Sequence, residues 1–233
     1  MRKNILIVAP PHVGKSTLLQ RVLQNVDDKF GFVTNEVLSD GSRVGFEIEA
    51  SFCKEKFMLA NVDFHTPHKV SRYGVNLQGF KIILKHIPEF PDSSLLYIDE
   101  IGEMQLMLSE YPKYVSRFLD SRNTFIATLS CVYKHEFIEK LKKRKDTIVV
   151  ELTPENRDEQ FLFVSHLLKK IEKARGYIAN PDRFSFPDGT ILLAAEHGER
   201  KLVFKEDKWR CDCDFHNKYN VCSHSIATED IFS

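Results

Sequence analysis

Eight residues near the start of the chain have the types and spacing that bind phosphate groups. Residues 9–16 read Ala-Pro-Pro-His-Val-Gly-Lys-Ser, the pattern of a phosphate-binding (Walker A) loop with alanine at its first glycine position. In such a loop, successive backbone N–H groups and the start of a helix surround one phosphate group. Lys15 then reaches the β- and γ-phosphates, and Gly14 lets the backbone approach closely. The expected nucleotide-binding residues are Ala9, Pro10, Pro11, His12, Val13, Gly14, Lys15, Ser16 and Thr17.

Two adjacent carboxylates follow an apolar segment later in the chain. Residues 95–98 read Leu-Leu-Tyr-Ile and are followed directly by Asp99 and Glu100, which is the Walker B pattern. We expect Asp99, together with the Ser16 hydroxyl, to hold Mg²⁺. Glu100 is expected to orient and activate a water molecule for attack on the γ-phosphate. The pattern predicts a nucleoside-triphosphatase in which Glu100 and Lys15 are catalytic.

Three cysteines and a histidine are crowded into the last part of the chain. They form the paired units Cys211-Asp212-Cys213 and Cys222-Ser223-His224. Three thiolates and one imidazole complete a tetrahedral Zn²⁺ shell, and sulfur donors favour Zn²⁺ over Mg²⁺ or Ca²⁺. The alternative is a set of free thiols or a redox pair. Substitution of a ligand by His216 or Asp214 would break the paired spacing.

Alternating strands and helices over the first 175 residues or so must position the two Walker motifs. Short apolar runs alternate there with segments of helical periodicity, which predicts a mostly parallel sheet covered by helices on both faces. Asp40-Gly41 predicts the turn of a hairpin. Strands are expected at 4–8, 31–34, 44–50, 95–98, 125–130 and 147–152, and helices at 15–26, 79–87, 109–120, 135–143 and from 155 onward.

The character of the sequence changes near residue 176, where two prolines and an Asp-Gly pair indicate a linker. A hairpin is expected from residues 190–196 and 200–205. The predicted fold is therefore α/β, with a P-loop NTPase domain at residues 1–177 and a small, β-rich zinc-binding domain at 178–233. A domain of about 55 residues is near the lower limit for a self-sufficient core, so zinc would supply folding energy.

Composition excludes several classes of protein. Hydrophobic residues are 42% and charged residues 28% of the 233, which excludes a disordered or fibrous chain. Uninterrupted apolar runs reach five residues, too few for a membrane span or signal peptide, so a soluble cytoplasmic protein is expected. Net charge is zero overall and −3 over residues 176–233. That distribution favours a protein partner or a structural role for the zinc domain over nonspecific nucleic-acid binding.

Several further motifs carry a family resemblance. Residues 31–37 (GFVTNEV), 43–48 (RVGFEI), 73–77 (YGVNL), 98–104 (IDEIGEM) and 153–158 (TPENRD) accompany the two Walker motifs. With them, residues 1 to about 168 resemble the small P-loop nucleoside-triphosphatases first described from thermophiles, which have a human cancer-related relative. The resemblance implies slow hydrolysis of nucleoside triphosphates to diphosphates with little base preference. It also implies an extra strand between the phosphate-loop strand and the Walker B strand. Ala9 and His12 stand where the family usually has glycine, and Gln105 where it usually has glutamate.

Transition-state charge on the γ-phosphate usually requires a further cation. Arg43, Arg72 and Arg157 all lie in family-like motifs, and Arg43 is the preferred candidate. Thr128 and Ser130 end the strand that follows the Walker B segment, where a polar side chain could contact the γ-phosphate or the water.

The zinc segment resembles the SWIM-type zinc finger over roughly residues 190–228, with Trp209 before the first ligand. That resemblance implies binding of nucleic acid or protein. The function predicted for the whole chain is Mg²⁺-dependent hydrolysis of ATP, GTP and other triphosphates, with a zinc-binding appendage. Two alternatives stay open: a P-loop kinase for a nucleoside or polynucleotide end, and a nucleotide-gated interaction module with vestigial hydrolysis.

Overall fold

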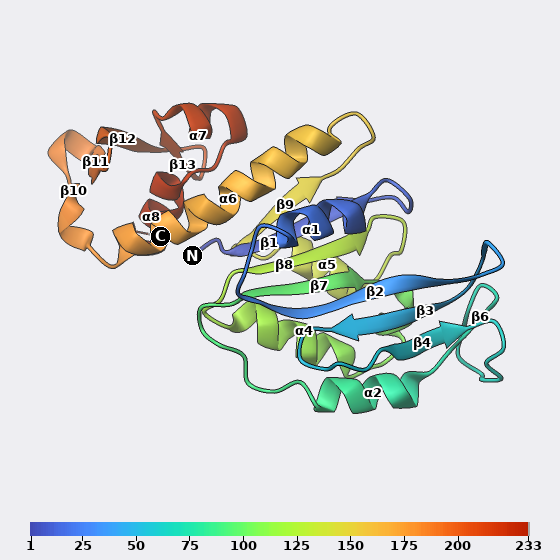
Figure 1. Ribbon diagram of the computed structural model, residues 1–233. Coiled ribbons are helices and arrows are strands. Elements are labelled where there is room, and N and C mark those ends of the chain that lie inside the picture. Colours follow the sequence, from blue (N-terminus) through green and yellow to red (C-terminus); the bar gives the residue numbers. More distant parts are fainter. Residues whose placement is uncertain (233) are drawn as a thin grey trace. The chain divides into compact units, whose positions relative to one another are not determined.

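The computed structural model describes residues 1–232, and the chain separates into two compact units (Figure 1). One unit is Asn4–Phe161, and the other combines Met1–Lys3 with the chain from Leu162 onward. The division therefore falls inside helix α6 (Arg157–Ile178), earlier than the expected boundary at residue 178. The reason is packing: Phe163 stacks on Tyr219 at 4.5 Å between ring centroids, so most of the helix forms part of the C-terminal core.

The N-terminal unit contains a nine-stranded sheet with the order β5-β6-β4-β3-β2-β7-β8-β1-β9. Strands β2, β7, β8, β1 and β9 are parallel to one another, and β8 lies between the phosphate-loop strand β1 and the Walker B strand β7. The mostly parallel α/β fold and the inserted strand are therefore as expected. The strands are β1 (Asn4–Ala9), β2 (Lys29–Ser39), β3 (Ser42–Ala50), β4 (Phe57–Asn61), β5 (Lys69–Val70), β6 (Tyr73–Val75), β7 (Leu95–Ile101), β8 (Phe125–Ser130) and β9 (Thr147–Glu151).

Antiparallel strands extend this sheet beyond β2. The predicted hairpin is confirmed: β2 and β3 are joined at Asp40 and Gly41, whose φ angles of 49° and 74° are those of a two-residue hairpin turn. Strands β4, β5 and β6 were not predicted, because their apolar runs are short and give no clear alternation. Because β3 is antiparallel to β2 and β4 is antiparallel to β3, strand β4 runs in the same direction as β7.

Helices cover both faces of the central strands. All six residues of β1 and all six of β8 are buried, which requires packing on both sides of the sheet. The largest fully buried side chains include Tyr111, Phe32, Phe80 and Phe118, and these form the core beneath the Walker B strand. The helices are α1 (Lys15–Leu23), α2 (Leu77–Lys85), α3 (Glu103–Leu106), α4 (Tyr111–Asp120) and α5 (Glu136–Lys142).

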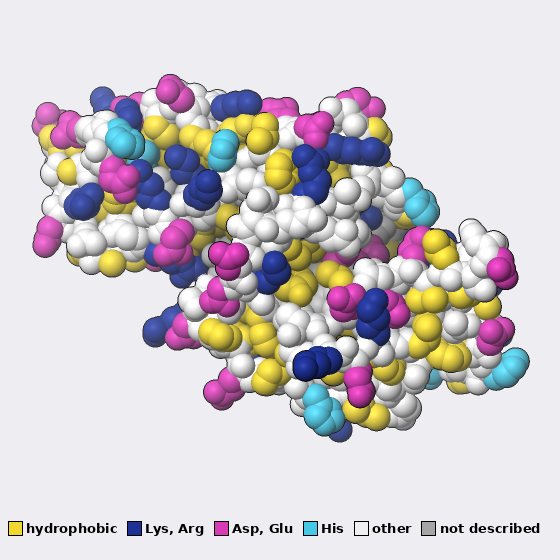
Figure 2. Space-filling model, in the orientation of Figure 1, with side chains coloured by type: hydrophobic (Ala, Val, Ile, Leu, Met, Phe, Trp, Pro, Cys, Tyr) yellow, Lys and Arg dark blue, Asp and Glu magenta, His cyan; other side chains and the backbone are white. Residues whose placement is uncertain are grey.

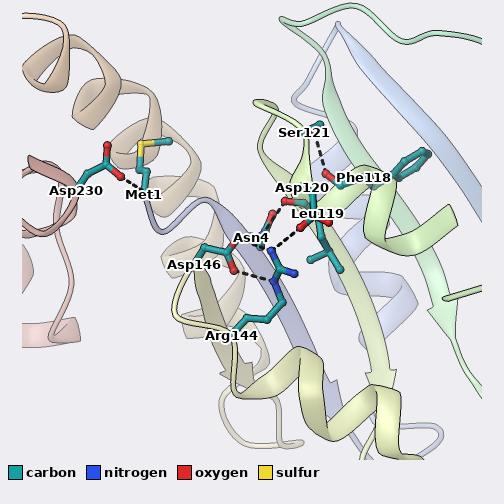
Figure 3. A network of polar contacts seen from close by, with 9 residues as sticks. All are labelled: Met1, Asn4, Phe118, Leu119, Asp120, Ser121, Arg144, Asp146 and Asp230. Atoms are coloured by element: carbon teal, nitrogen blue, oxygen red, sulfur yellow. Dashed lines mark hydrogen bonds and ion pairs between the residues drawn. The ribbon is translucent and has the colours of Figure 1, made fainter. Parts of the chain in front are cut away.

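A polar network connects the ends of the strands that lie opposite the phosphate loop (Figure 3). Arg144 lies 2.8 Å from Asp120 at the end of α4 and 2.7 Å from Asp146 before β9. Asn4, at the start of β1, donates to the backbone carbonyl of Leu119 at 3.3 Å. These contacts fix the starts of β1, which leads into the phosphate loop, and of its neighbour β9.

The C-terminal unit has a four-stranded antiparallel sheet, followed by two helices. The predicted hairpin is present as β11 and β12, which turn at Glu196 and His197. The elements are β10 (Phe184–Ser185), β11 (Ile191–Ala195), β12 (Gly198–Lys205), β13 (Lys208–Cys211), α7 (Asp214–Tyr219) and α8 (Ser223–Phe232). Ion pairs of the Met1 amino group with Asp230 and of Arg2 with Glu229 join the first residues of the chain to α8. Within residues 1–232, no helix is long and apolar enough to cross a membrane.

Candidate functional site

The phosphate loop joins the end of β1 to the start of α1. Gly14 caps the helix with a φ of 103°, a left-handed conformation that an L side chain rarely adopts. His12 has a φ of 63° and is exposed, so its ring faces solvent. Left-handed backbone costs a residue with a side chain about 1 kcal/mol. The loop geometry therefore explains why glycine is common at both positions in the family that the sequence resembles.

Lys15 is buried at the centre of this loop. Its Nζ donates to the carbonyl oxygens of Ala9 at 3.3 Å and Pro10 at 3.2 Å. The same Nζ lies 3.9 Å from a carboxylate oxygen of Glu100. The ammonium group is thus held between the phosphate loop and the end of the Walker B strand.

Asp99 is the buried carboxylate at the end of β7, with 1% of its surface exposed. The Ser16 hydroxyl donates to its Oδ1 at 3.2 Å, and the Thr128 hydroxyl donates to the same oxygen. Oδ2 has no hydrogen-bond partner among the residues described. Burial raises the pKa of Asp99, while the two hydroxyls and the charge of Lys15 act in the opposite direction.

This donor set fits Mg²⁺. A buried carboxylate oxygen without a partner costs free energy unless a cation or a donor meets it. The Ser16 hydroxyl beside it adds a second hard oxygen of the kind that Mg²⁺ prefers. The Thr128 hydroxyl, which the sequence suggested as a contact for the γ-phosphate or water, donates a hydrogen bond to Asp99.

Glu100 lies at an irregularity in the sheet, where the pairing of β7 with β8 shifts between Ile98 and Ile101. Its side chain is 37% exposed, so water can reach it. Burial of the remainder raises the pKa of Glu100; Lys15 lowers it and Asp99 raises it further. A carboxylate with a raised pKa is a stronger base, which suits proton abstraction from water. Five residues after Glu100, the side-chain amide of the buried Gln105 donates to the Thr34 hydroxyl at 3.1 Å. The sequence did not indicate Gln105 as a site residue.

Arg43 is not brought to the phosphate loop. Its guanidinium donates to the Tyr73 hydroxyl at 3.1 Å and pairs with Glu36. Arg43 is opposite Leu38, whereas Val33, five residues earlier on β2, is the residue opposite Asp99. Five residues of strand correspond to about 16 Å. The hairpin thus carries Arg43 well beyond the Walker B carboxylates, which sequence spacing alone did not reveal.

Arg157 is the candidate arginine that the structure does bring to the loop. Its Nε lies 3.6 Å from the point where a Cβ on Gly14 would stand. Arg157 opens α6 directly after the loop that follows β9. The loops that follow parallel strands lie at the same end of the sheet. The loops after β1 and β9 therefore bring Gly14 and Arg157 together, although they are 143 positions apart in the sequence.

The predicted zinc ligands are gathered in the C-terminal unit. Cys211, Cys213, Cys222 and His224 are buried, and their ligand atoms all lie within 4.8 Å of one another. His224 Nδ1 is 3.5 Å from the Cys211 sulfur and 3.8 Å from the Cys222 sulfur. A tetrahedral zinc ion with normal Zn–S and Zn–N distances requires separations of about 3.5–3.8 Å. The cluster therefore fits Zn²⁺.

Contacts among the three thiols shift their pKa values in opposite directions. Hydrogen bonds from the Cys211 and Cys222 thiols lower the pKa of Cys213, and the same crowding raises the pKa of Cys211. His216, 3% exposed, lies beside the cluster with neither ring nitrogen partnered among the residues described, and burial lowers its pKa. It is a second buried imidazole next to the four ligands.

The N-terminal unit has the fold and the site of a P-loop nucleoside-triphosphate-binding protein. Comparison with known proteins makes this specific. A family model described as NTPase matches residues 4–164. The nucleoside-triphosphatase THEP1 of Thermotoga sp. (strain RQ2) is 34% identical over 71% of this chain and 95% of its own length. The THEP1 of Natranaerobius thermophilus is 35% identical over 73% and 97%.

Two solved structures agree with the sequence relatives. THEP1 from Aquifex aeolicus has a TM-score of 0.61 at 27% identity, covering 71% of this chain and 99% of its own. A human cancer-related nucleoside triphosphatase has a TM-score of 0.58 at 25% identity, covering 72% and 97%. The chain belongs to the THEP1 nucleoside-triphosphatase family and is an enzyme that hydrolyses nucleoside triphosphates.

Proposed function

We propose that the unit Asn4–Phe161 hydrolyses nucleoside triphosphates to diphosphates and phosphate in a Mg²⁺-dependent reaction with little base preference. The observation that carries the proposal is the arrangement around Asp99. Its Oδ1 is held by Ser16 and Thr128, its Oδ2 is without a partner, and Lys15 lies nearby, 3.9 Å from Glu100.

Each side chain has a distinct task in this reaction. The loop N–H groups and Lys15 bind the β- and γ-phosphate oxygens. Ser16 and Asp99 would hold Mg²⁺, which when bound neutralises charge on those oxygens. Glu100 accepts a proton from the water that attacks the γ-phosphorus. The bond from that phosphorus to the bridging oxygen breaks, and the nucleoside diphosphate leaves with the electron pair.

Phosphate release from ATP, GTP, CTP and UTP, measured with Mg²⁺ and in EDTA, tests this function. We expect release without any added acceptor, which a kinase would require. Lys15→Ala should weaken Mg·ATP binding about 10²-fold, because the side chain is buried and charged. Tight nucleotide binding by the wild-type protein without measurable turnover would instead support the nucleotide-gated module.

Arginine substitutions test which cation assists the reaction. Arg157→Ala should lower turnover about 10-fold or more, because the guanidinium lies at Gly14 of the phosphate loop. Arg43→Ala should change turnover less than threefold, since its partners are Glu36 and Tyr73 on the hairpin. Steady-state kinetics of the two variants provide the comparison, and the reverse order would return the role to Arg43.

For the C-terminal unit we propose one structural Zn²⁺, held by Cys211, Cys213, Cys222 and His224 in a SWIM-like arrangement. The unit as folded includes most of α6 and Met1–Lys3, and its net charge is +2, with 13 Lys and Arg against 11 Asp and Glu. Basic and acidic side chains are interspersed on the face that Figure 2 shows. Because charges of both signs are interspersed there rather than gathered in one basic patch, we propose a protein as the partner of this unit, and the cytoplasm, which keeps thiols reduced, as its compartment.

A further inference from the structure

A pocket of about 520 Å³ lies in the N-terminal unit, lined by none of the residues assigned above to nucleotide or metal. Its walls come from the loop after β4, from the first turn of α2 and from the loop between α3 and α4. The volume is within the usual range for small-molecule sites, about 300–1,000 Å³. Figure 2 shows histidine side chains at the surface where the loops beside β6 lie in Figure 1.

Several polar side chains of the pocket are available to form hydrogen bonds with a ligand. The side chains of His65, His68 and Gln78 line it, are exposed, and make no hydrogen bond or ion pair with other residues that the structure describes. The Asn76 side-chain oxygen accepts from the backbone N–H of Gly79 at 3.0 Å, which leaves its amide group as a donor. These groups offer both donors and acceptors to a ligand edge.

The charge of the pocket argues against an anion. Lys81 is the lysine that lines it, and that ammonium group is paired with Glu110. Asp63, which also lines the pocket, contributes a negative charge. Phe64, Leu77 and Met107 supply apolar surface among the polar groups. Such a lining suits a neutral, flat ligand with an apolar face and a hydrogen-bonding edge, because amide side chains pair well with the edges of heterocyclic bases.

The pocket is connected to the Walker B segment. The loop that carries Met107 and Ser109 follows α3, which itself begins three residues after Glu100. On the other side of that loop, the buried Tyr111 hydroxyl donates to the Glu100 backbone carbonyl at 3.4 Å. Because β4 and β7 run in the same direction, the loop after β4 and Glu100 follow corresponding ends of their strands, separated by three strand spacings, or about 14 Å across the sheet, and by a further offset along the strands.

We propose that this pocket binds a neutral heterocyclic ligand of nucleoside type, and that its occupation alters triphosphate hydrolysis through the α3–α4 loop. The binding step is independent of the proposed function, whereas the effect on hydrolysis rests on it. The ligand is bound without any covalent change.

Titration calorimetry with adenosine, guanosine, cytidine and uridine tests the binding step. The full-length Lys15→Ala protein is used, so that the phosphate loop is disabled. We expect one nucleoside per chain to bind. Gln78→Ala and His65→Ala should each weaken that binding about 10-fold through loss of a hydrogen bond. His86→Ala is the matched control, because this exposed histidine at the end of α2 lies outside the pocket lining.

Three results would overturn the proposal: no binding at millimolar nucleoside, binding that Gln78→Ala and His65→Ala leave unchanged, or binding of inorganic phosphate in place of nucleosides.

The effect of the bound nucleoside on hydrolysis is tested with the otherwise wild-type protein at saturating Mg·ATP. We expect the bound nucleoside to change the rate of phosphate release at least twofold, and Gln78→Ala to remove the change. An unchanged rate at saturating nucleoside would overturn the coupling. Absence of hydrolysis in every sample would count against the proposed function, while the calorimetry would still decide the binding.

Discussion

Glu100→Gln is expected to retain Mg·ATP binding and to lose about 10²- to 10⁴-fold in turnover, the range typical of losing a general base. The substitution keeps the size of the side chain and removes the charge that accepts the proton. Lys15 and the Asp99 cluster, which bind the nucleotide and Mg²⁺, are left in place. Single-turnover phosphate release, together with equilibrium nucleotide binding, separates the two effects.

The dependence of turnover on pH gives the same prediction a second readout. Burial raises the pKa of Glu100, so the carboxyl group stays protonated, and unable to accept a proton, up to a higher pH than an ordinary glutamate. Wild-type turnover should therefore fall as pH decreases through that raised pKa, and the variant should lack this limb. Glu103→Gln is the matched control, since Glu103 is exposed at the start of α3. Wild-type turnover in Glu100→Gln would show that the water is positioned by another group.

Removal of zinc is expected to unfold the C-terminal unit while the N-terminal unit stays folded. Purified, reduced protein should carry about one Zn²⁺ per chain, because three cysteines and one histidine complete the shell. Binding to such a site contributes about 10–16 kcal/mol in small zinc domains, more than a unit of this size obtains from its core. After chelation, limited proteolysis should cut within residues 179–232 and spare the nine-stranded sheet.

Cysteine substitutions separate zinc from general effects of thiol loss. Cys213→Ser should lose the metal and the protection from protease, whereas Cys53→Ser, at an exposed free cysteine, should retain both. Hydrolysis should recover in the chelated protein once Mg²⁺ is restored, since Ser16 and Asp99 are oxygen ligands in the other unit. Metal analysis without zinc would refute the site. Lost hydrolysis that Mg²⁺ does not restore would show that the zinc unit is part of the catalytic machinery.

Much of the active site follows from local sequence. The phosphate loop, the Walker B carboxylates and the paired zinc ligands are each defined by residues close together in the chain, so spacing and residue type suffice to predict them. Their strands and helices also follow, because apolar runs such as 95–98 and the periodicity after Lys15 are strong local signals. The strands β4 to β6 did not follow, since an antiparallel extension is stabilised by pairing with neighbours rather than by its own sequence.

Only the tertiary structure shows which residues far apart in the sequence are in contact. The sequence by itself determined that three arginines were candidates, but only the topology placed Arg157 at Gly14 and carried Arg43 away along the β2–β3 hairpin. Likewise, the helical periodicity of α6 determined a helix, and its packing against Tyr219 decided that most of it belongs with the C-terminal unit. The physical reason is the same in each case. A sequence motif specifies only the local structure of its own residues, whereas strand order and side-chain packing determine long-range contacts.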